Sequence, residues 1–407
     1  MEVNLIMPSE FISVAEARNL INAHIEALDP VNVSLMDAGG LILSEDVFAQ
    51  TDVPPFNQSS MDGYAFNYES WKTHGQLSIE GEVAAGSAEN TRLEAHKAIR
   101  IFTGAAIPEG ADTVVMQEKV RINDRILIIE DDILTKGSNF RAKGSEILSG
   151  ALALEKGTVM TPAAIGYLAG VGVNGINAYP YPSVSIILTG DELQSPGKTL
   201  EHGQVYESNS FALNAALRQT GITRINFLSS EDTLETLTDV LTKALDNSDV
   251  ILLTGGVSVG DYDFVVRAAM ANGVEQVFHK IRQKPGKPLF FGTKGKNIIF
   301  GLPGNPASVL SCFYEYVLPA LGQMSQRETA LKSLKVPLKT ALKKPAGLTQ
   351  FLKGHYDGNS ASDLQAQESF RLSSFAKANC LIKLEEGKTE LKENEIVEIH
   401  LLPEYYG

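Results

Sequence analysis

Apolar residues recur at helical spacing close to the start of the chain. The apolar positions are Ala17, Leu20, Ile21, Ile25 and Leu28. They would share one face of a helix, because residues three and four apart are neighbours on a helix surface. Ser13 and Glu16 precede this run with the S-x-x-E spacing of a capping box. The pattern therefore predicts a helix that begins after Ser13.

A loop rich in Pro, Asn and Ser covers residues 51–60, and from Met61 to about Ser149 the apolar stretches are short and separated by turns, which is typical of a mostly β module. The expected strands cover residues 77–83, 98–102, 113–116 and 125–129. Thr161 followed by Pro162 is a good helix start, with the threonine as N-cap and the proline in the first turn.

Beyond residue 182 apolar strands alternate with helical stretches. The expected strands cover residues 183–189, 225–228, 250–253 and 298–300, and the expected helices cover residues 208–219, 233–244, 264–271 and a last stretch to about 321. This alternation predicts βαβ units and a parallel, doubly wound sheet. Ligands of such sheets bind outside the carboxyl ends of the strands. The segment 333–407 is strand-rich and predicts a small β domain.

The composition is that of a globular protein with an acidic surface. The chain has 407 residues, of which 43% are hydrophobic and 21% charged, values ordinary for a protein of several domains. Lysine and arginine number 35 against 49 acidic residues, a net charge of −14. A surface of this sign repels nucleic acid and anionic lipid, so neither is expected as a main partner. An anionic substrate would need a local basic patch.

The two cysteines, Cys312 and Cys380, are too few for a disulfide framework, and the sequence has no C-x-x-C pair for zinc. The first residues, MEVNLIMPSE, lack the basic start of a signal peptide. Pro180 and Pro182 interrupt the longest uncharged stretch, whose apolar part is too short to span a bilayer. We therefore expect a cytoplasmic protein.

The string TGGVSVGD follows an expected strand, and its glycines would let backbone N–H groups approach an anion. The alternative is a tight strand-to-helix turn with capping carboxylates. Asp261 and Asp263 favour more than a turn, because carboxylates repel phosphate unless a metal bridges the two.

The string HKIRQKPGKP carries four positive charges in ten residues and no acid. The charges belong to Lys280, Arg282, Lys284 and Lys287. In a chain of net charge −14 this local reversal favours a cradle for phosphate or another oxyanion, with lysines acting as point charges. A solvated basic turn is the alternative.

Two further strings end expected strands at the same edge of the sheet. GLPGNPAS contains Pro303 and Pro306, which fix a turn, and Asn305, which is placed to cap the following helix. TGDEL places Asp191 and Glu192 beside the same crevice. A structural turn and a solvated strand end are the alternatives to a ligand-binding role.

Two loops of the β module also carry polar residues of interest. SSMDGYA holds Asp62, FTGAAIP holds Thr103, and Glu118 closes the string MQE. Spacing alone assigns these residues no role, because a loop acid is usually solvated and Thr103 can serve as a simple turn hydroxyl.

The strings SSMDGYA, FTGAAIP, MQE, TGDEL, TGGVSVGDYD, KPGKP and GLPGNPAS occur in this order. Together they resemble the MoeA-type molybdopterin molybdenumtransferases, a family that also forms a domain of gephyrin, over nearly the whole chain. The resemblance implies an enzyme that takes adenylylated molybdopterin and molybdate as substrates. It would cleave the pyrophosphate linkage, insert molybdenum at the dithiolene, release AMP and require a divalent cation, usually Mg²⁺.

The resemblance also implies an architecture. The fold class would be α/β multidomain, with a doubly wound molybdopterin-binding domain and mostly β modules, the last one barrel-like. The expected domains are residues 1–28 with 178–326 (doubly wound), 29–50 with 150–177 (connecting and dimerisation), 51–149 (mostly β) and 327–407 (C-terminal β). Two subunits would form a homodimer in which each contributes to the other's active-site cleft. Molybdopterin adenylyltransferase and maturation factors of molybdoenzymes are the further partners that it suggests.

Motif by motif, the resemblance assigns roles to single residues. Catalytic roles fall to Asp62, Thr103, Glu118, Glu192 and Asp263, and metal binding falls to Asp191, Glu192, Asp261 and Asp263. Substrate binding falls to Arg141, Asp232, Gly255, Gly256, Ser258, Gly260, Lys280, Lys284, Lys287, Pro303, Pro306, Lys353 and Ser369. Glu146, Glu207 and Lys353 depart from the family pattern. Lys353 replaces an expected arginine, so a bidentate contact becomes a point charge.

Two other functions stay open on the sequence. The related molybdopterin adenylyltransferase shares the doubly wound domain, but it needs only that domain, whereas several further segments surround it here. A non-catalytic molybdopterin-binding scaffold is the second alternative, and the acids and lysines retained in the strings argue against it.

Overall fold

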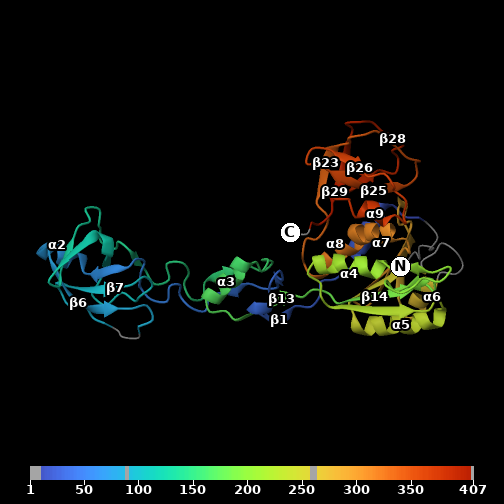
Figure 1. The fold of residues 1–407 in the computed structure, drawn as a ribbon. Coiled ribbons are helices and arrows are strands. Elements are labelled where there is room, and N and C mark those ends of the chain that lie inside the picture. The colour runs from blue at the N-terminus through green and yellow to red at the C-terminus, as the bar shows by residue number, and fades with distance from the viewer. Residues whose placement is uncertain (1–10, 88–90, 257–263, 405–407) are drawn as a thin grey trace, which may run out of the picture. The chain divides into compact units, whose positions relative to one another are not determined.

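The computed structural model describes residues 11–87, 91–256 and 264–404 (Figure 1). The chain divides into two compact units, residues 1–30 with 179–407 and residues 31–178. The four domains expected from the sequence are a finer division, which stays a prediction.

The first unit is built on a six-stranded sheet with the strand order β17-β14-β18-β22-β21-β19. The strands are β14 (Val184–Thr189), β17 (Ile225–Ser230), β18 (Val250–Thr254), β19 (Glu275–Lys280), β21 (Pro288–Lys294) and β22 (Asn297–Leu302). The first four strands in the sheet order run parallel, as predicted. The strands β19 and β21 were not among those expected from the sequence. β21 runs antiparallel to both neighbours, because a tight turn at Gly295 joins it to β22 as a hairpin.

Helices cover both faces of this sheet (Figure 1). They are α1 (Val14–Ala23), α4 (Asn209–Gln219), α5 (Leu234–Asn247), α6 (Phe264–Ala271), α7 (Pro306–Cys312) and α8 (Leu318–Met324). Successive strand residues point to opposite faces. Ile186 and Leu252 therefore pack in a core with α4, α7 and α8, whereas Ile187 and Leu253 pack with α5 and α6. The sheet is doubly wound, as the alternation of strands and helices predicted.

The helix α1 begins where its capping box was predicted. The Glu16 backbone N–H donates to Ser13 Oγ at 3.2 Å, and the Ser13 N–H donates to a Glu16 carboxylate oxygen at 2.6 Å. Ala17 and Ile21 are buried in the same core as Ile186. The first helix thus packs with the doubly wound sheet, although the whole second unit separates the two in the sequence.

The end of the chain forms a second sheet of the first unit, with the order β20-β25-β27-β29-β23 and β26 beside β25. The strands are β20 (Gln283–Lys284), β23 (Ser333–Pro337), β25 (Thr349–Tyr356), β26 (Ala361–Asp363), β27 (Cys380–Leu384) and β29 (Ile396–Leu401). β20 belongs to the basic string and pairs parallel with β25. Backbone hydrogen bonds therefore fix the basic string to the C-terminal sheet.

The second unit contains a six-stranded sheet with the order β8-β5-β7-β6-β10-β9. The strands are β5 (Gly63–Phe66), β6 (Leu77–Val83), β7 (Lys97–Ile101), β8 (Thr113–Met116), β9 (Val120–Asn123) and β10 (Ile126–Ile129). The short helix α2 (Tyr68–His74) was not predicted, whereas α3 (Pro162–Gly170) begins after its predicted cap, Thr161. Within the described ranges, no helix is long and apolar enough to cross a membrane.

Candidate active site

Three of the predicted strings meet at the carboxyl-end edge of the doubly wound sheet. Leu188 of β14 lies beside Thr254 of β18, and Thr254 lies beside Leu302 of β22. TGDEL, TGG and LPGNP therefore leave the sheet from adjacent positions. Asn209, at the start of α4, joins them because its Nδ2 donates to the Gly304 carbonyl oxygen at 2.9 Å.

A cavity of about 540 Å³ opens at this edge, and we name it the acceptor cavity. It is lined by Thr189, Glu192, Leu193, Val205, Tyr206, Glu207, Ser208, Asn209, Thr254, Gly255, Gly304, Asn305, Pro306 and Phe370. No lysine or arginine is among these described lining residues, whereas two carboxylates are. Glu207, one of the departures from the family pattern, is buried and accepts hydrogen bonds from the N–H and Oγ of Ser210 at 2.7 and 2.6 Å.

A second cavity, of about 380 Å³, lies on the other side of Gly304 and Asn305, which line both. We name it the cationic cavity. It is lined by Gln283, Lys284, Pro285, Gly286, Lys287, Pro288, Pro303, Gly304, Asn305, Ser308, Leu348, Gln367 and Ser369. No acidic residue is among these described lining residues. The turn between β22 and α7 thus separates a positive cavity from a negative one.

Buried contacts hold the turn that carries Lys284 and Lys287. Gln283 Nε2 donates to the Gly286 carbonyl at 3.0 Å, and the Tyr316 hydroxyl donates to Gln283 Oε1. Gly286 has a φ of +86°, and a Cβ at this position would overlap the Cys312 sulfur. Burial raises the pKa of the Cys312 thiol far above its ordinary value, so the thiol stays protonated and serves packing.

The charged side chains of the basic string make two kinds of contact. Lys280 and Lys287 share the ring of Phe11, with Nζ to ring-centroid distances of 5.8 and 4.5 Å. Arg282 instead pairs with Glu386, with 3.1 Å between Nε and Oε1, and donates to the Phe11 carbonyl. The lysines therefore stay together, while Arg282 ties the string to the C-terminal sheet.

Ser369 comes from the C-terminal part of the chain to the wall between the cavities. Its Oγ accepts from Asn305 Nδ2 at 3.0 Å, and its carbonyl accepts from the Ala307 N–H at 3.0 Å. Asn305 occupies the N-cap position of α7 as predicted, but its side chain makes no capping hydrogen bond to the helix. Pro303 and Pro306 lie beside it, one in each cavity.

Lys353 lies beneath the loop that carries Ser369. Its ammonium donates to the carbonyls of Ala366, Glu368 and Arg371 at 2.8, 3.2 and 3.0 Å. Burial lowers the pKa of Lys353. Because an ammonium has three N–H donors and all three are used here, we expect Lys353 to position this loop.

The predicted metal ligands and their neighbours are only partly described. Asp191 Oδ1 accepts from the Asp232 N–H at 3.3 Å, and Asp232 Oδ1 accepts from Thr189 Oγ1 at 3.3 Å, with Gly256 beside them. The predicted site residues outside the described part are Ser258, Gly260, Asp261 and Asp263. Among the residues that the structure describes, no three His, Cys, Asp or Glu side chains converge as a metal site.

In the second unit, Asp62 and Thr103 lie at one edge of the sheet. Gly63 of β5 pairs with Ile101 of β7 and with Met116 of β8, so the residues that flank these three strands meet. A Cβ at Gly63 would overlap the backbone of β8. Asp62 Oδ1 accepts from both the N–H and Oγ1 of Thr103, each at 2.7 Å.

The group around Asp62 and Thr103 also includes Glu118, together with Arg100 and Gln117, to which the sequence analysis assigned no role. The backbone N–H of Thr103 and then its hydroxyl lower the pKa of Asp62, and Arg100 adds to the effect. Arg100 donates to the Gln117 side chain, whose Nε2 donates to Glu118 at 3.1 Å. Arg141 stands apart in a small two-stranded pairing, opposite Gln58.

No signal in the sequence singled out Arg100, but the register of β5 and β7 places it beside Tyr64. Asn209 was also missed, since it looked like an ordinary start of a helix. Thr254 stood in the TGG string without a role of its own. Each of these positions depends on which strands become neighbours, which the residue pattern does not state.

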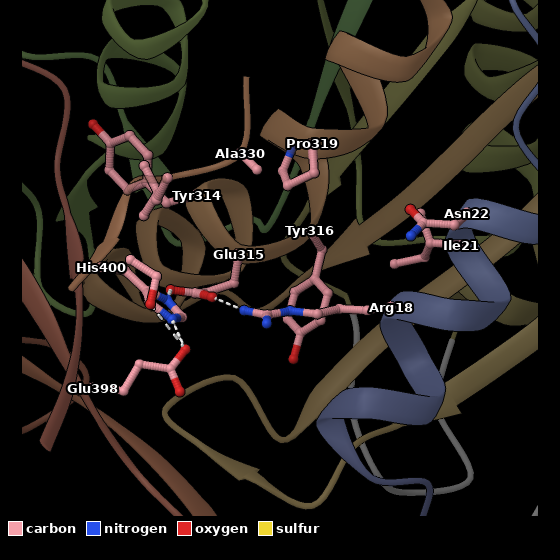
Figure 2. A pocket seen from close by; sticks show the side chains of 12 residues that line it. Arg18, Ile21, Asn22, Tyr314, Glu315, Tyr316, Pro319, Ala330, Glu398 and His400 are labelled. Carbon is pink, nitrogen blue, oxygen red and sulfur yellow. Dashed lines mark hydrogen bonds and ion pairs between the residues drawn. The ribbon is translucent and has the colours of Figure 1, made fainter. Parts of the chain in front are cut away.

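A third cavity, of about 240 Å³, lies where α1 and the segment between α7 and α8 meet the C-terminal sheet. We name it the junction cavity. Figure 2 shows the buried Glu315 carboxylate between the Arg18 guanidinium and the His400 ring. His400 Nδ1 lies 2.7 Å from Glu315, and its Nε2 lies 2.9 Å from Glu398. Glu398 also pairs with Lys383 at 3.1 Å.

The charged groups around the junction cavity shift the pKa values of His400 and Glu398. Burial of His400 disfavours its imidazolium, but the hydrogen bonds to Glu315 and Glu398 outweigh burial and raise the pKa of His400. Burial alone would raise the pKa of Glu398, yet bonds from His400 and Lys383 lower it to about 2. The junction is a chain of alternating charges in which each group has its partner.

The fold of the first unit and the cationic cavity define a doubly wound α/β protein with a basic cavity at the carboxyl ends of its parallel strands. Three family profiles match consecutive parts of the chain. They are "MoeA N-terminal region (domain I and II)" over residues 12–172, "Probable molybdopterin binding domain" over 185–323 and "MoeA C-terminal region (domain IV)" over 335–402.

Curated relatives are similar over almost the full length. A molybdopterin molybdenumtransferase of Haemophilus influenzae is 34% identical over 382 residues, which are 91% of this chain and 94% of the relative. One of Staphylococcus aureus is 32% identical over 401 residues, 96% of this chain and 95% of the relative. A crystal structure of a Pyrococcus horikoshii molybdopterin biosynthesis MoeA protein matches with a TM-score of 0.82 and 28% identity, and the match covers 97% of this chain and 100% of that one. This chain belongs to the MoeA family of molybdopterin molybdenumtransferases.

Proposed function

We propose that this chain inserts molybdenum into molybdopterin. The observation that carries the proposal is the cationic cavity, which places Lys284 and Lys287 at the sheet edge of a chain with net charge −14. Molybdate and the phosphates of a molybdopterin substrate are anions, which lysines bind as point charges. The near full-length similarity to enzymes of this name supports the same reaction.

In more detail, we propose adenylylated molybdopterin as the second substrate and AMP as a product. Lys280, Lys284 and Lys287 would hold the oxyanions, and Ser369 would add a hydroxyl donor. The rigid turn supports this role, because donors fixed before binding lose little freedom when the anion arrives.

We also propose a homodimer, acting in the cytoplasm, in which the second unit of one subunit completes the edge site of the other. The residues it would bring are Asp62, Thr103 and Glu118. The bonds from Thr103 keep Asp62 ionised and fix its orientation. An ionised, oriented carboxylate is suited to hold a water molecule or a substrate hydroxyl during cleavage of the pyrophosphate.

Mg²⁺ belongs to the proposal as the ion that would neutralise the pyrophosphate charge when bound. Asp191 and Glu192 offer the carboxylate oxygens that Mg²⁺ prefers. The described residues do not gather three such ligands, so the described part of the chain does not by itself form the Mg²⁺ site.

The test is AMP release from adenylylated molybdopterin with Mg²⁺, measured with and without molybdate. We expect molybdate-dependent release by the wild type and a fall of about a hundredfold in Asp62→Asn, because the charge that orients the reacting groups is lost. Asp131→Asn is the control, since Asp131 is a loop acid of the same unit that accepts a local backbone N–H. A folded wild type that binds the substrate but releases no AMP would overturn the proposal.

A further inference from the structure

Three charged side chains of the basic string converge on Phe11. Lys280 and Lys287 place their Nζ atoms 5.8 and 4.5 Å from the centre of its ring. Arg282 donates a guanidinium N–H to its backbone carbonyl. Phe11 lies just before α1, and the whole second unit separates it from the basic string in the sequence. The sequence analysis assigned this residue no role.

Backbone hydrogen bonds fix Phe11 beside the basic string. The N–H of the next residue, Ile12, donates to the Lys280 carbonyl at 3.2 Å, and the Arg282 N–H donates to the Ile12 carbonyl at 2.8 Å. Ile12 thereby pairs in parallel with Ile281, whose side chain is fully buried. The ring is therefore attached to a backbone that cannot move away from the lysines without breaking these bonds.

The ring and the acids hold different charges of the string. The Arg282 guanidinium pairs with Glu386 at 3.1 Å and lies 3.9 Å from Glu16, so carboxylates compensate its charge. Lys280 and Lys287 rest against an aromatic ring instead. A ring face attracts an ammonium group but carries no net charge, so it holds the cation without neutralising it. These two lysines are thus fixed in place and keep the positive charge that an anion requires.

The two ammonium groups would separate without such a support. Like charges repel one another, and a long lysine side chain has many rotamers that would carry its charge into solvent. Lys287 lines the cationic cavity, whereas Lys280 is not among the described lining residues. The ring that both lysines share is what keeps the charge of Lys280 close to this cavity.

We infer that Phe11 is a positioning residue of the oxyanion site, whose ring keeps Lys280 and Lys287 together at the cationic cavity before the anion arrives. The inference rests on the proposed function, which assigns oxyanion binding to these lysines. An anion that meets two ammonium groups already held in place does not have to order them. Phe11 therefore sets the affinity for the anion and has no part in the chemical step.

The experiment measures binding of orthophosphate to the full chain by calorimetry. Phe11→Leu keeps an apolar side chain but removes the ring, whereas Phe11→Tyr keeps the ring. Phe227→Leu is the control, because Phe227 is a half-exposed ring on β17 that lines none of the three named cavities. We expect Phe11→Leu to weaken orthophosphate about threefold to fivefold, which corresponds to the attraction between a cation and an exposed ring. Phe11→Tyr and Phe227→Leu should bind like the wild type.

Double-mutant cycles separate positioning of the lysines from a general structural role. In a Lys287→Ala background, Phe11→Leu should change the affinity by less than about 1.5-fold, because the lysine closest to the ring is gone. In a Lys284→Ala background the loss should stay at about threefold or more, since no ring contact of Lys284 occurs among the described residues. A merely structural Phe11 would lower the melting temperature when replaced and would weaken binding equally in both backgrounds.

The inference is overturned if Phe11→Leu binds orthophosphate like the wild type, or if Phe11→Tyr loses as much affinity as Phe11→Leu. It is also overturned if the loss is the same with and without Lys287, or if the wild type does not bind orthophosphate measurably. AMP release is measured separately. A wild type that shows the expected dependence on Phe11 but releases no AMP would overturn only the proposed function, whereas AMP release with no dependence on Phe11 would overturn only the inference.

Discussion

The junction cavity and the acceptor cavity are both lined by buried polar side chains, but they differ in whether those side chains have partners. At the junction, Glu315 is bonded to Arg18 and His400, and Glu398 is bonded to His400 and Lys383. In the acceptor cavity, two oxygen atoms have no partner among the described residues.

The difference separates a structural contact from a candidate binding site. A completed charge network holds two parts of the molecule together and leaves nothing for a ligand to bond. Incomplete polar groups lower the stability of the free protein and are retained where binding completes them. Substitutions at the junction should therefore change stability, whereas substitutions at the sheet edge should change binding.

The largest effect is expected at the junction. Glu315→Gln removes the charge between Arg18 and His400 and should lower the free energy of unfolding of the first unit by about 3 kcal/mol, because a broken buried pair leaves uncompensated charge. Denaturant unfolding measures it, with Glu235→Gln on an exposed position of α5 as the control. Unchanged stability, or lost substrate affinity in folded protein, would contradict the assignment of this cavity to structure.

At the sheet edge the opposite pattern is expected. Lys287→Ala should weaken orthophosphate binding by about 30-fold, equivalent to about 2 kcal/mol for a hydrogen bond to a charged group. Its unfolding should stay like that of the wild type, because the side chain is exposed. Lys296→Ala is the matched control, since this exposed lysine pairs with Asp29 instead. Equal phosphate affinity in both variants would show that Lys287 and the cationic cavity do not bind phosphate.

Lys353 tests whether one residue can contribute both to stability and to substrate binding. Lys353→Met should cost about 1 kcal/mol of stability and raise KM for the substrate with little change in kcat, because the loop with Ser369 loses its three bonds. Lys353→Arg should restore both quantities, since a guanidinium also donates to several carbonyls. A fall in kcat alone, not restored by arginine, would indicate direct contact with the reacting atoms.

The smallest effect is a pH dependence at the junction. The pKa of His400 is raised in the folded state, so its stabilising contribution is complete below the unfolded pKa of about 6.5 and disappears as pH rises through the folded pKa. Comparing unfolding of the wild type and His400→Gln from pH 5 to 9 should show a difference that shrinks as pH rises. A difference that grows with pH would contradict the protonated histidine.

The contribution of Glu398, in the same network, has the opposite pH dependence. The pKa of Glu398 falls to about 2 on folding, so its contribution is present above the unfolded value of about 4.3 and is lost as pH falls toward 2. The junction is therefore expected to contribute most between about pH 4.5 and 6.5.

The four parallel strands of the doubly wound sheet and the helices that follow them could be predicted from the sequence, because buried strands have continuous apolar runs and helices have amphipathic ones. Three strings could be placed at one edge because parallel strands share their carboxyl ends. The two remaining strands, β19 and β21, which pair antiparallel, were not predicted, since the interpretation of this region depended on the charges of the basic string. The extra helix α2 was missed because seven residues are too short for a clear helical period.

Within the site, the charged residues could be named from the sequence, but their partners could not. Asn305 occupies the N-cap position of α7, but its side chain donates to Ser369, which comes from the other sheet. Lys353 was expected to bind substrate, and its N–H donors are used by three carbonyls of the loop that carries Ser369. Unpartnered atoms such as Asn209 Oδ1 are defined by what surrounds them in space, which a single sequence does not contain.

The pairing of β20 with β25 has a consequence for anyone who builds chimaeras of this family. The boundary after residue 326 looks like a seam between modules, yet the strand that carries Lys284 takes its backbone hydrogen bonds from the last part of the chain. Exchanging the C-terminal segment for that of a relative would replace the partner strand of the basic turn. A graft at this boundary therefore replaces one of the two paired strands beside the cationic cavity, and its design has to keep residues 283–287 and 349–350 from the same parent.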